Sequence, residues 1–191
     1  VIALDTRGHG QTPRGDAPFT LDQFAQDLLE FMDARQIEKA HLLGFSDGGN
    51  IALLFALHHP ERVERLILNG ANLSPKGVKK GIQLSVVLGY EAACALSQID
   101  RRAVAKREML GLMVNQPNID PAELSRLPMP TLVVAGERDM ILEDHTKLIA
   151  RSIPHATLCI LPGDHFVAAK NSEAFNKQVM DFLQTVPAAR S

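Results

Sequence analysis

Short apolar runs alternate along the chain with longer segments in which apolar residues recur every three or four positions. The short runs are typical of buried strands and the longer segments of amphipathic helices, so their alternation predicts a parallel sheet joined by crossover helices. Thr20 is placed to cap the first helix. The predicted strands span 1–4, 41–43, 63–68, 131–135 and 157–161, the predicted helices span 21–35, 50–59, 144–152 and 173–183, and 187–191 is a predicted loose tail.

The segment from 73 to 127 interrupts this alternation. It contains three helix-like stretches, at 79–88, 91–96 and 101–114. Because one crossover needs only a dozen or so residues, we interpret the segment as a helical cap inserted over one end of the sheet. Ordinary crossover helices packed on the sheet are the alternative. The predicted organisation is therefore a first sheet part at 1–72, a helical cap at 73–127 and a second sheet part at 128–187.

Composition limits the classes of function. The chain has 191 residues, 46% of them hydrophobic and 22% charged, which fits one globular domain. A net charge of -2 without a basic stripe predicts neither a nucleic-acid partner nor an anionic membrane partner. No apolar run reaches membrane-spanning length and no signal peptide is visible, so a cytoplasmic location is expected. Cys94 and Cys159 are expected to be buried free thiols, and a homo-oligomer is left open.

The run Leu42-Leu43-Gly44-Phe45-Ser46-Asp47-Gly48-Gly49 carries the most chemical information. A strand that ends in Gly-x-Ser-x-Gly and continues as a helix is the context of a nucleophile elbow. We expect Gly44 and Gly48 to let backbone approach backbone in the turn, because neither has a Cβ. Ser46 would then stand near a helix N-terminus, where N–H groups point at developing negative charge.

A serine nucleophile needs a base, and the base needs an acid that orients it. Gly136-Glu137-Arg138-Asp139 and Gly163-Asp164-His165-Phe166 both follow predicted strands, on the sheet edge where Ser46 lies. We assign Asp139 as the acid and His165 as the base. Glu137 and Asp144 are weaker candidates for the acid, and Asp164 is interpreted as a turn residue. His9 could approach the site, but a structural role of its loop is favoured. The remaining histidines, including His145, are expected at element ends or on the surface.

The loop Asp5-Thr6-Arg7-Gly8-His9-Gly10 has glycine spacing that could suggest a phosphate cradle. No helix follows promptly and no Lys-Ser/Thr pair is present, so a structural role is favoured. Gly8 and Gly10 would permit a tight turn that Asp5 and Arg7 brace by hydrogen bonds near the elbow.

These motifs, in this order, resemble the α/β-hydrolase superfamily over almost the whole chain. The Ser-Asp-Gly-Gly form of the elbow is similar to the capped carboxylesterase branch that includes valacyclovir-hydrolase-like enzymes. Ser46 argues against dehalogenases and epoxide hydrolases, which have an Asp nucleophile. The resemblance implies an α/β-hydrolase fold with a mostly parallel sheet and a helical cap.

The resemblance also implies that the usual N-terminal strands are lacking. Family members have about three strands before the one at 1–4, and the loop after the third supplies one oxyanion N–H; the residue after the nucleophile, here Asp47, supplies the other. The absent third strand would lie between two strands that are present, so we expect unpaired backbone inside the sheet. The chain is therefore expected to be a fragment, or to repair its sheet by rearrangement or partner exchange.

The predicted function is a serine hydrolase that cleaves small esters or related acyl substrates through an acyl-enzyme. The substrate is the small-molecule partner, and no metal or organic cofactor is required. Hydrolysis of a C–C bond, perhydrolysis and amide cleavage use the same three residues and stay open. A further alternative is a truncated ligand-binding or interaction module without catalysis.

Overall fold

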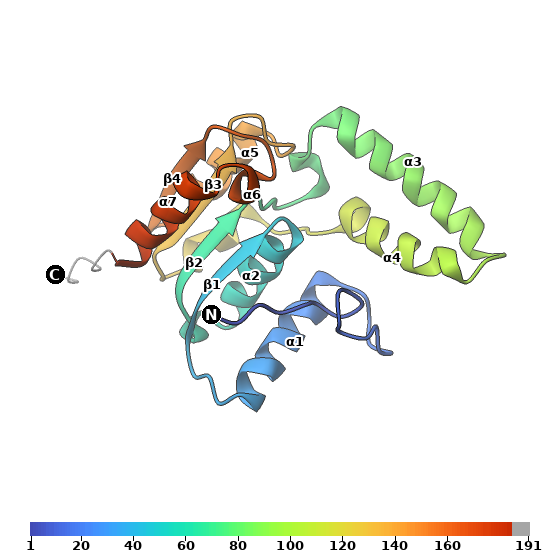
Figure 1. The fold of residues 1–191 in the computed structure, drawn as a ribbon, viewed down its shortest axis with the longest axis horizontal. Helices are drawn as coiled ribbons and strands as arrows, with labels where there is room; N and C mark the ends of the chain where they lie inside the picture. Colours follow the sequence, from blue (N-terminus) through green and yellow to red (C-terminus); the bar gives the residue numbers. More distant parts are fainter. Residues whose placement is uncertain (185–191) are drawn as a thin grey trace.

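A four-stranded parallel sheet forms the centre of the molecule in the computed structural model, which describes residues 1–184; the tail predicted at 187–191 lies outside them (Figure 1). The strands pair in the order β1-β2-β3-β4, all parallel, so chain order is also spatial order. The predicted parallel sheet is confirmed. Its strands are β1 (Ala40–Phe45), β2 (Val63–Asn69), β3 (Thr131–Gly136) and β4 (Ala156–Leu161).

Helices cover the sheet on both faces and so make three layers. One face packs against α1 (Leu21–Ala34), α2 (Asp47–His58) and α5 (Glu143–Ser152), and the other against α6 (Val167–Lys170) and α7 (Ser172–Gln184). Alternate residues of β2 divide between the two cores: Leu68 faces α2, and Ile67 faces α7. Short 3₁₀ turns are η1 (Pro60–Arg62), η2 (Pro75–Gly77) and η3 (Pro121–Arg126).

Local sequence explains why α1 begins where it does. The Thr20 hydroxyl accepts a hydrogen bond from the backbone N–H of Gln23 at 3.2 Å, which confirms the predicted cap. The side-chain amide of Gln116 accepts a second N–H, that of Leu21, at 2.8 Å. Two of the four N–H groups that a helix start leaves unpaired are therefore satisfied.

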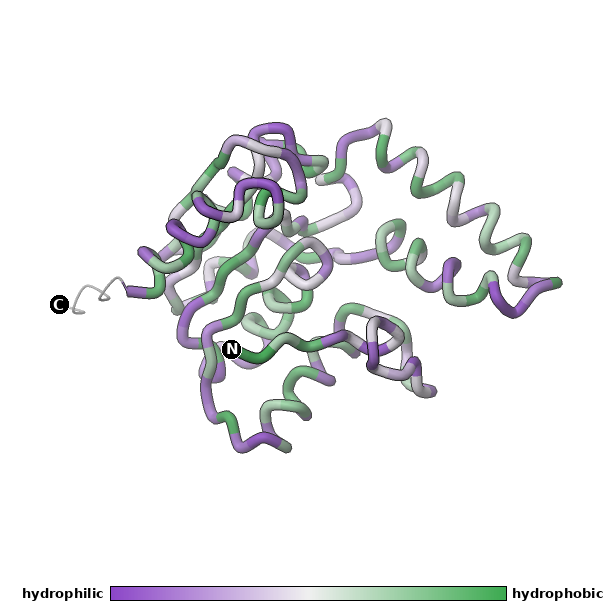
Figure 2. The backbone as a smooth tube through the Cα atoms, in the orientation of Figure 1, coloured by the Kyte–Doolittle hydropathy of each residue, from purple (hydrophilic) through white to green (hydrophobic). Residues whose placement is uncertain are grey.

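The inserted segment forms a hairpin of two long helices, α3 (Lys80–Ser97) and α4 (Arg102–Asn115), beyond the carboxyl ends of the strands (Figure 1). The predicted break between 79–88 and 91–96 is wrong, because α3 continues through Gly89. A glycine inside a helix costs only about 1 kcal/mol, and at this glycine a Cβ would lie 3.4 Å from a Leu110 methyl of α4. Figure 2 shows hydrophobic and hydrophilic stretches alternating along both helices.

The prediction of a strand at 1–4 is wrong. Residues Val1 to Asp5 are extended and exposed, and no strand pairs with them. Strand formation depends on a hydrogen-bonded neighbour, which an apolar run does not supply by itself. The expected unpaired backbone inside the sheet is not found either, since the four strands pair without a gap. β1 is instead an edge strand, and Leu43 and Phe45 on it are 50% and 38% exposed.

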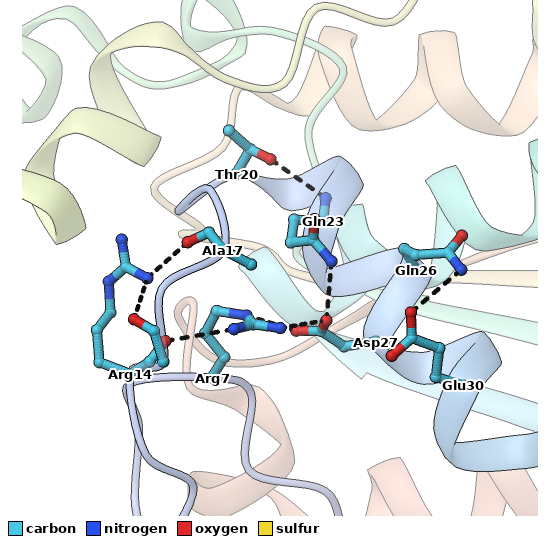
Figure 3. A network of polar contacts seen from close by, with 9 residues as sticks. Arg7, Arg14, Ala17, Thr20, Gln23, Gln26, Asp27 and Glu30 are labelled. Atoms are coloured by element: carbon cyan, nitrogen blue, oxygen red, sulfur yellow. Dashed lines mark hydrogen bonds and ion pairs between the residues drawn. The ribbon is translucent and has the colours of Figure 1, made fainter. Parts of the chain in front are cut away.

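Two arginine side chains brace the N-terminal loop, and Figure 3 shows the ion pair of Arg7 with Asp27. Arg7 donates to both carboxylate oxygens of Asp27 on α1, at 2.6 and 2.8 Å, so the predicted brace reaches α1 rather than the elbow. Arg14 makes a similar two-bond pair with Glu108 of α4, at 2.7 and 2.9 Å. The loop is thereby tied to the core and to the hairpin.

Two further expectations concern burial and membranes. Cys94 and Cys159 are free thiols, but both are half-buried rather than buried. Within residues 1–184, no helix has the length and apolar content needed to cross a membrane.

Candidate active site

Ser46 occupies a strained turn between β1 and α2. Its φ and ψ are 53° and −120°, a region that costs a non-glycine residue about 1–3 kcal/mol. The turn is held because the Ser46 N–H donates to the Asn69 carbonyl at the end of β2, at 2.8 Å. Strand, turn and helix therefore form the elbow that the sequence predicts, with Ser46 at its apex.

Close backbone packing explains one of the two elbow glycines. A Cβ on Gly44 would lie 2.1 Å from the Gly48 carbonyl oxygen, a backbone atom that cannot move aside. A Cβ on Gly48 would meet nothing within 4 Å, so the expectation that Gly48 is needed for close approach is wrong. Gly49 takes that role instead, because its Cβ would lie 3.0 Å from that of Ala71.

These distances make a paired prediction for unfolding. Gly44→Ala is expected to destabilise the fold by more than about 2 kcal/mol, because elbow and strand must separate. Gly48→Ala, the matched control, is expected to be neutral or to stabilise by up to about 1 kcal/mol, because alanine favours the helix. Urea unfolding of both variants checks this. Equal stability of the two would contradict the close approach.

Ser46, His165 and Asp139 form one hydrogen-bonded chain at the carboxyl edge of the sheet. Ser46 Oγ lies 3.0 Å from His165 Nε2, and His165 Nδ1 lies 2.7 Å from Asp139 Oδ1. Ser46 and His165 are 119 positions apart in the sequence, and Asp139 and His165 are 26 positions apart. They meet because the loops after β1, β3 and β4 all open at the same edge. His165 and Asp139 are only 6% and 3% exposed, which shields their hydrogen bond from water.

The environment of Asp139 keeps its carboxyl ionised. Burial raises the pKa of this group, but the hydrogen bond from His165 and those from the N–H groups of Ile141 and Gly136 outweigh burial. The net effect lowers the pKa of Asp139 below its ordinary value. An ionised carboxylate bonded to Nδ1 holds the imidazole with Nε2 toward Ser46.

Comparison with known proteins identifies the family of this chain. Residues 1–85 match the family model described as the alpha/beta hydrolase fold. The human serine hydrolase BPHL is 30% identical to this chain, over 96% of this chain and 69% of BPHL. The 2-hydroxymuconate semialdehyde hydrolase of Pseudomonas sp. strain CF600 is 31% identical, over 99% of this chain and 78% of that enzyme. A crystal structure of a hydrolase from Pseudomonas aeruginosa PA01 superposes with a TM-score of 0.72 and 30% sequence identity. The match covers 95% of this chain and 78% of that hydrolase.

The chain belongs to the α/β-hydrolase family. The relatives described above are named hydrolases, and the chain is an enzyme of this class. The family match confirms the fold class that the sequence predicts.

The His165 ring of this α/β hydrolase is packed from two sides. Gly70, with φ +65°, follows β2, and a Cβ there would lie 2.8 Å from His165 Cε1. The Phe45 ring lies 4.9 Å from the imidazole. In the sequence, Asn69-Gly70 indicates only the end of a strand. The structure shows that Gly70, which has no Cβ, leaves room for the His165 ring.

Asp47, the predicted oxyanion donor, is the first residue of α2. Its backbone N–H belongs to the first turn, where no intrahelical acceptor exists, so it is available to an anion. Its carboxyl is also part of the site. Burial raises the pKa of Asp47, only partly offset by the charges of His9 and His165 and by a hydrogen bond from Asn50.

The raised pKa of Asp47 predicts a stability effect. A carboxyl whose folded pKa is raised stabilises the fold below its unfolded pKa and loses that contribution as pH rises through the folded pKa. Asp47→Asn is therefore expected to be more stable than the parent at pH 7, and the gap is expected to close as pH falls below 3.8, the ordinary pKa of aspartate. Thermal unfolding of both proteins at these two pH values checks this. A gap that widens in acid would contradict the burial argument.

The other candidates do not join the hydrogen-bonded chain. Glu137 and Asp144 are exposed, and the Asp164 carboxylate bonds to the Phe166 N–H and to Lys170. His9 bonds to Thr6 and stacks on Phe19, near enough to Asp47 to act on its charge. Within the described residues, no group of three His, Cys, Asp or Glu side chains is arranged to hold a metal ion.

One histidine departs from its predicted place. The sequence predicts His145 on the surface, but the side chain is half-buried, and its Nε2 accepts the Leu73 N–H at 2.9 Å. Sequence carried no signal for this contact, because the two residues are 72 positions apart.

Proposed function

We propose that this α/β hydrolase cleaves small esters or related acyl compounds through a covalent intermediate on Ser46. The observation that carries the proposal is the continuous chain of hydrogen bonds from Ser46 Oγ through His165 to Asp139. A serine hydroxyl is a weak nucleophile at neutral pH, and a histidine base held by a carboxylate activates it.

The chemistry follows from these three positions. His165 Nε2 takes the Ser46 proton as Oγ attacks the acyl carbon, and the oxygen of the tetrahedral intermediate faces the Asp47 N–H. His165 then gives that proton to the leaving alcohol as the carbon–oxygen bond breaks, leaving an ester on Ser46. Water, deprotonated by His165, attacks this ester. As the bond between the acyl carbon and Ser46 Oγ breaks, His165 gives that proton to Oγ, and the carboxylic acid leaves.

The helical hairpin of α3 and α4 is proposed to be the cap of the acyl pocket. It lies beyond the strand ends where Ser46 stands, and it carries exposed apolar residues. Apolar side chains above a nucleophile exclude water and accept an uncharged acyl or alcohol group. The substrate class that fits is a small acyl compound with an apolar side. The apolar residues are Ile82, Leu84, Leu88, Leu96 and Met109.

The deciding experiment is intact-mass spectrometry before and after a fluorophosphonate probe. One adduct per chain, absent in Ser46→Ala, would support an assembled triad and justify an ester panel. No adduct on a folded protein would overturn the proposal and favour a binding module, which ligand-induced stabilisation without turnover would then reveal.

Hydrolysis of a carbon–carbon bond is the second candidate. Its support is the relative named for 2-hydroxymuconate semialdehyde, a substrate without an ester bond. An enzyme that takes the fluorophosphonate adduct but ignores every ester tested would favour this candidate.

A further inference from the structure

The segment from Asn72 to Lys79, here called the cap-entry segment, leads from β2 into α3. On one side it is bonded to the helix that follows the nucleophile. The Asn72 N–H donates to Asn50 Oδ1 at 2.9 Å, and Asn50 Nδ2 donates to Asn72 Oδ1 at 3.0 Å. Both amides are buried, so each hydrogen bond is costly to lose.

On its other side the cap-entry segment is bonded to the loop of Asp139. Val78 and Ile141 form an antiparallel bridge. The Lys79 N–H donates to the Met140 carbonyl at 2.9 Å, and the Leu142 N–H donates to the Gly77 carbonyl at 2.8 Å. Figure 1 shows this segment beside α5. The cap-entry segment therefore connects the nucleophile, the acid and the hairpin.

His145 on α5 contacts this segment at two residues, Leu73 and Gly77. Its Nε2 accepts the Leu73 N–H, and Gly77 packs so closely that a Cβ there would lie 2.5 Å from Cδ2. Because Nε2 accepts, the ring is neutral with its proton on Nδ1. Protonation of Nε2 would place its N–H opposite the Leu73 N–H. Because two donors cannot bond to each other, the hydrogen bond between His145 and Leu73 would be lost. Burial lowers the pKa of His145 and so favours the neutral ring.

Burial, rather than a neighbouring charge, sets the direction in which the pKa of His145 shifts. Strands β3 and β4, which pack against α5, carry no charged residue. No ion pair within residues 1–184 includes His145, and Glu123, Glu143 and Asp139 pair with Arg126, Lys147 and His165. The charged groups on the elements around it are Lys76 and Lys79 on the cap-entry segment, Glu123 and Arg126 on η3, Asp139 beside the bridge, and Glu143, Asp144, Lys147 and Arg151 on α5 itself.

We propose that neutral His145 is a positioning residue for the hydrolysis: it holds the cap-entry segment between α2 and the Asp139 loop, and protonation of its ring releases that segment. This inference rests on the proposed function for its effect on the reaction, but the release itself does not. The enzyme would thus lose the alignment of cap and acid in mild acid while its sheet remains folded.

Release of the cap-entry segment is tested first by a measurement that does not depend on enzymatic activity. Nitrogen-15 NMR of the full chain follows the His145 ring and the Leu73 amide as pH falls. We expect the Leu73 amide to shift and lose hydrogen-exchange protection as the ring gains its proton, at a pH below the ordinary 6.5 of histidine. A Leu73 amide that stays protected while the ring titrates would overturn the proposal.

The effect on the reaction is tested by the pH dependence of fluorophosphonate labelling of Ser46. A rate that needs a second neutral group falls more steeply in acid, up to about 100-fold per pH unit against about 10-fold for one group. His145→Gln keeps an acceptor that gains no proton, so its rate should fall less steeply than that of the parent. His155→Gln, an exposed histidine on the next loop, is the control and should match the parent.

Each outcome has a distinct meaning. Identical profiles for the parent and His145→Gln would overturn the positioning role. No labelling of any variant would overturn the proposed function, while the NMR titration would still decide the release.

A glycine pair tests the same contact if His145→Gln does not fold. Gly77→Ala pushes a methyl group against the ring and should lower Leu73 amide protection at neutral pH at least tenfold. Gly81→Ala makes the same change four residues later, where a Cβ meets nothing within 4 Å, and should leave protection unchanged. Equal protection in both variants would contradict the contact.

Discussion

Ser46→Ala is expected to lower ester turnover on the order of 10⁴- to 10⁶-fold, because it removes the atom that forms the acyl-enzyme. The residual rate would come from binding and from the Asp47 N–H. Steady-state kinetics with an activated ester, on protein checked by mass, measures the loss.

The fold of this variant should be unaffected. Alanine at φ 53° has the same backbone strain as serine, and the Ser46 N–H that bonds to Asn69 is retained. An unfolding temperature within a few degrees of the parent therefore makes the kinetic loss interpretable. Turnover within tenfold of the parent would refute Ser46 as the nucleophile.

Asp139→Asn is expected to lower kcat on the order of 10⁴-fold. The amide can accept through one oxygen only, while the carboxylate now accepts from the N–H groups of Ile141 and Gly136 as well as from His165. An asparagine NH₂ toward Nδ1 would favour the tautomer with the proton on Nε2, which cannot accept the Ser46 proton.

Glu137→Gln is the matched control for this change. It alters a carboxylate in the same loop that is exposed and forms no bond to His165. Its kcat should stay within about twofold of the parent. If Glu137→Gln lost as much activity as Asp139→Asn, the assignment of the acid would fail.

The sequence predicts a strand at 131–135 and another at 1–4, but the structure has a strand only at the first of these positions. Both are short apolar runs, but β3 lies between β2 and β4, whereas Val1 to Leu4 has no neighbour to pair with. Periodicity reports which residues prefer burial, and a strand also needs a partner for its backbone. The same limit explains α3, where packing against α4 carries the helix through Gly89.

The sequence by itself determined strands β1 to β4, helices α1, α2, α5 and α7, the elbow around Ser46, and the two loops that carry Asp139 and His165, because each depends on residues that are neighbours along the chain. Tertiary structure alone decided that Gly44 rather than Gly48 is sterically required, that Gly70 and Phe45 pack the imidazole, and that His145 holds the cap-entry segment. These contacts join residues on different elements, and their distances depend on how those elements pack. No pattern along the chain encodes such distances.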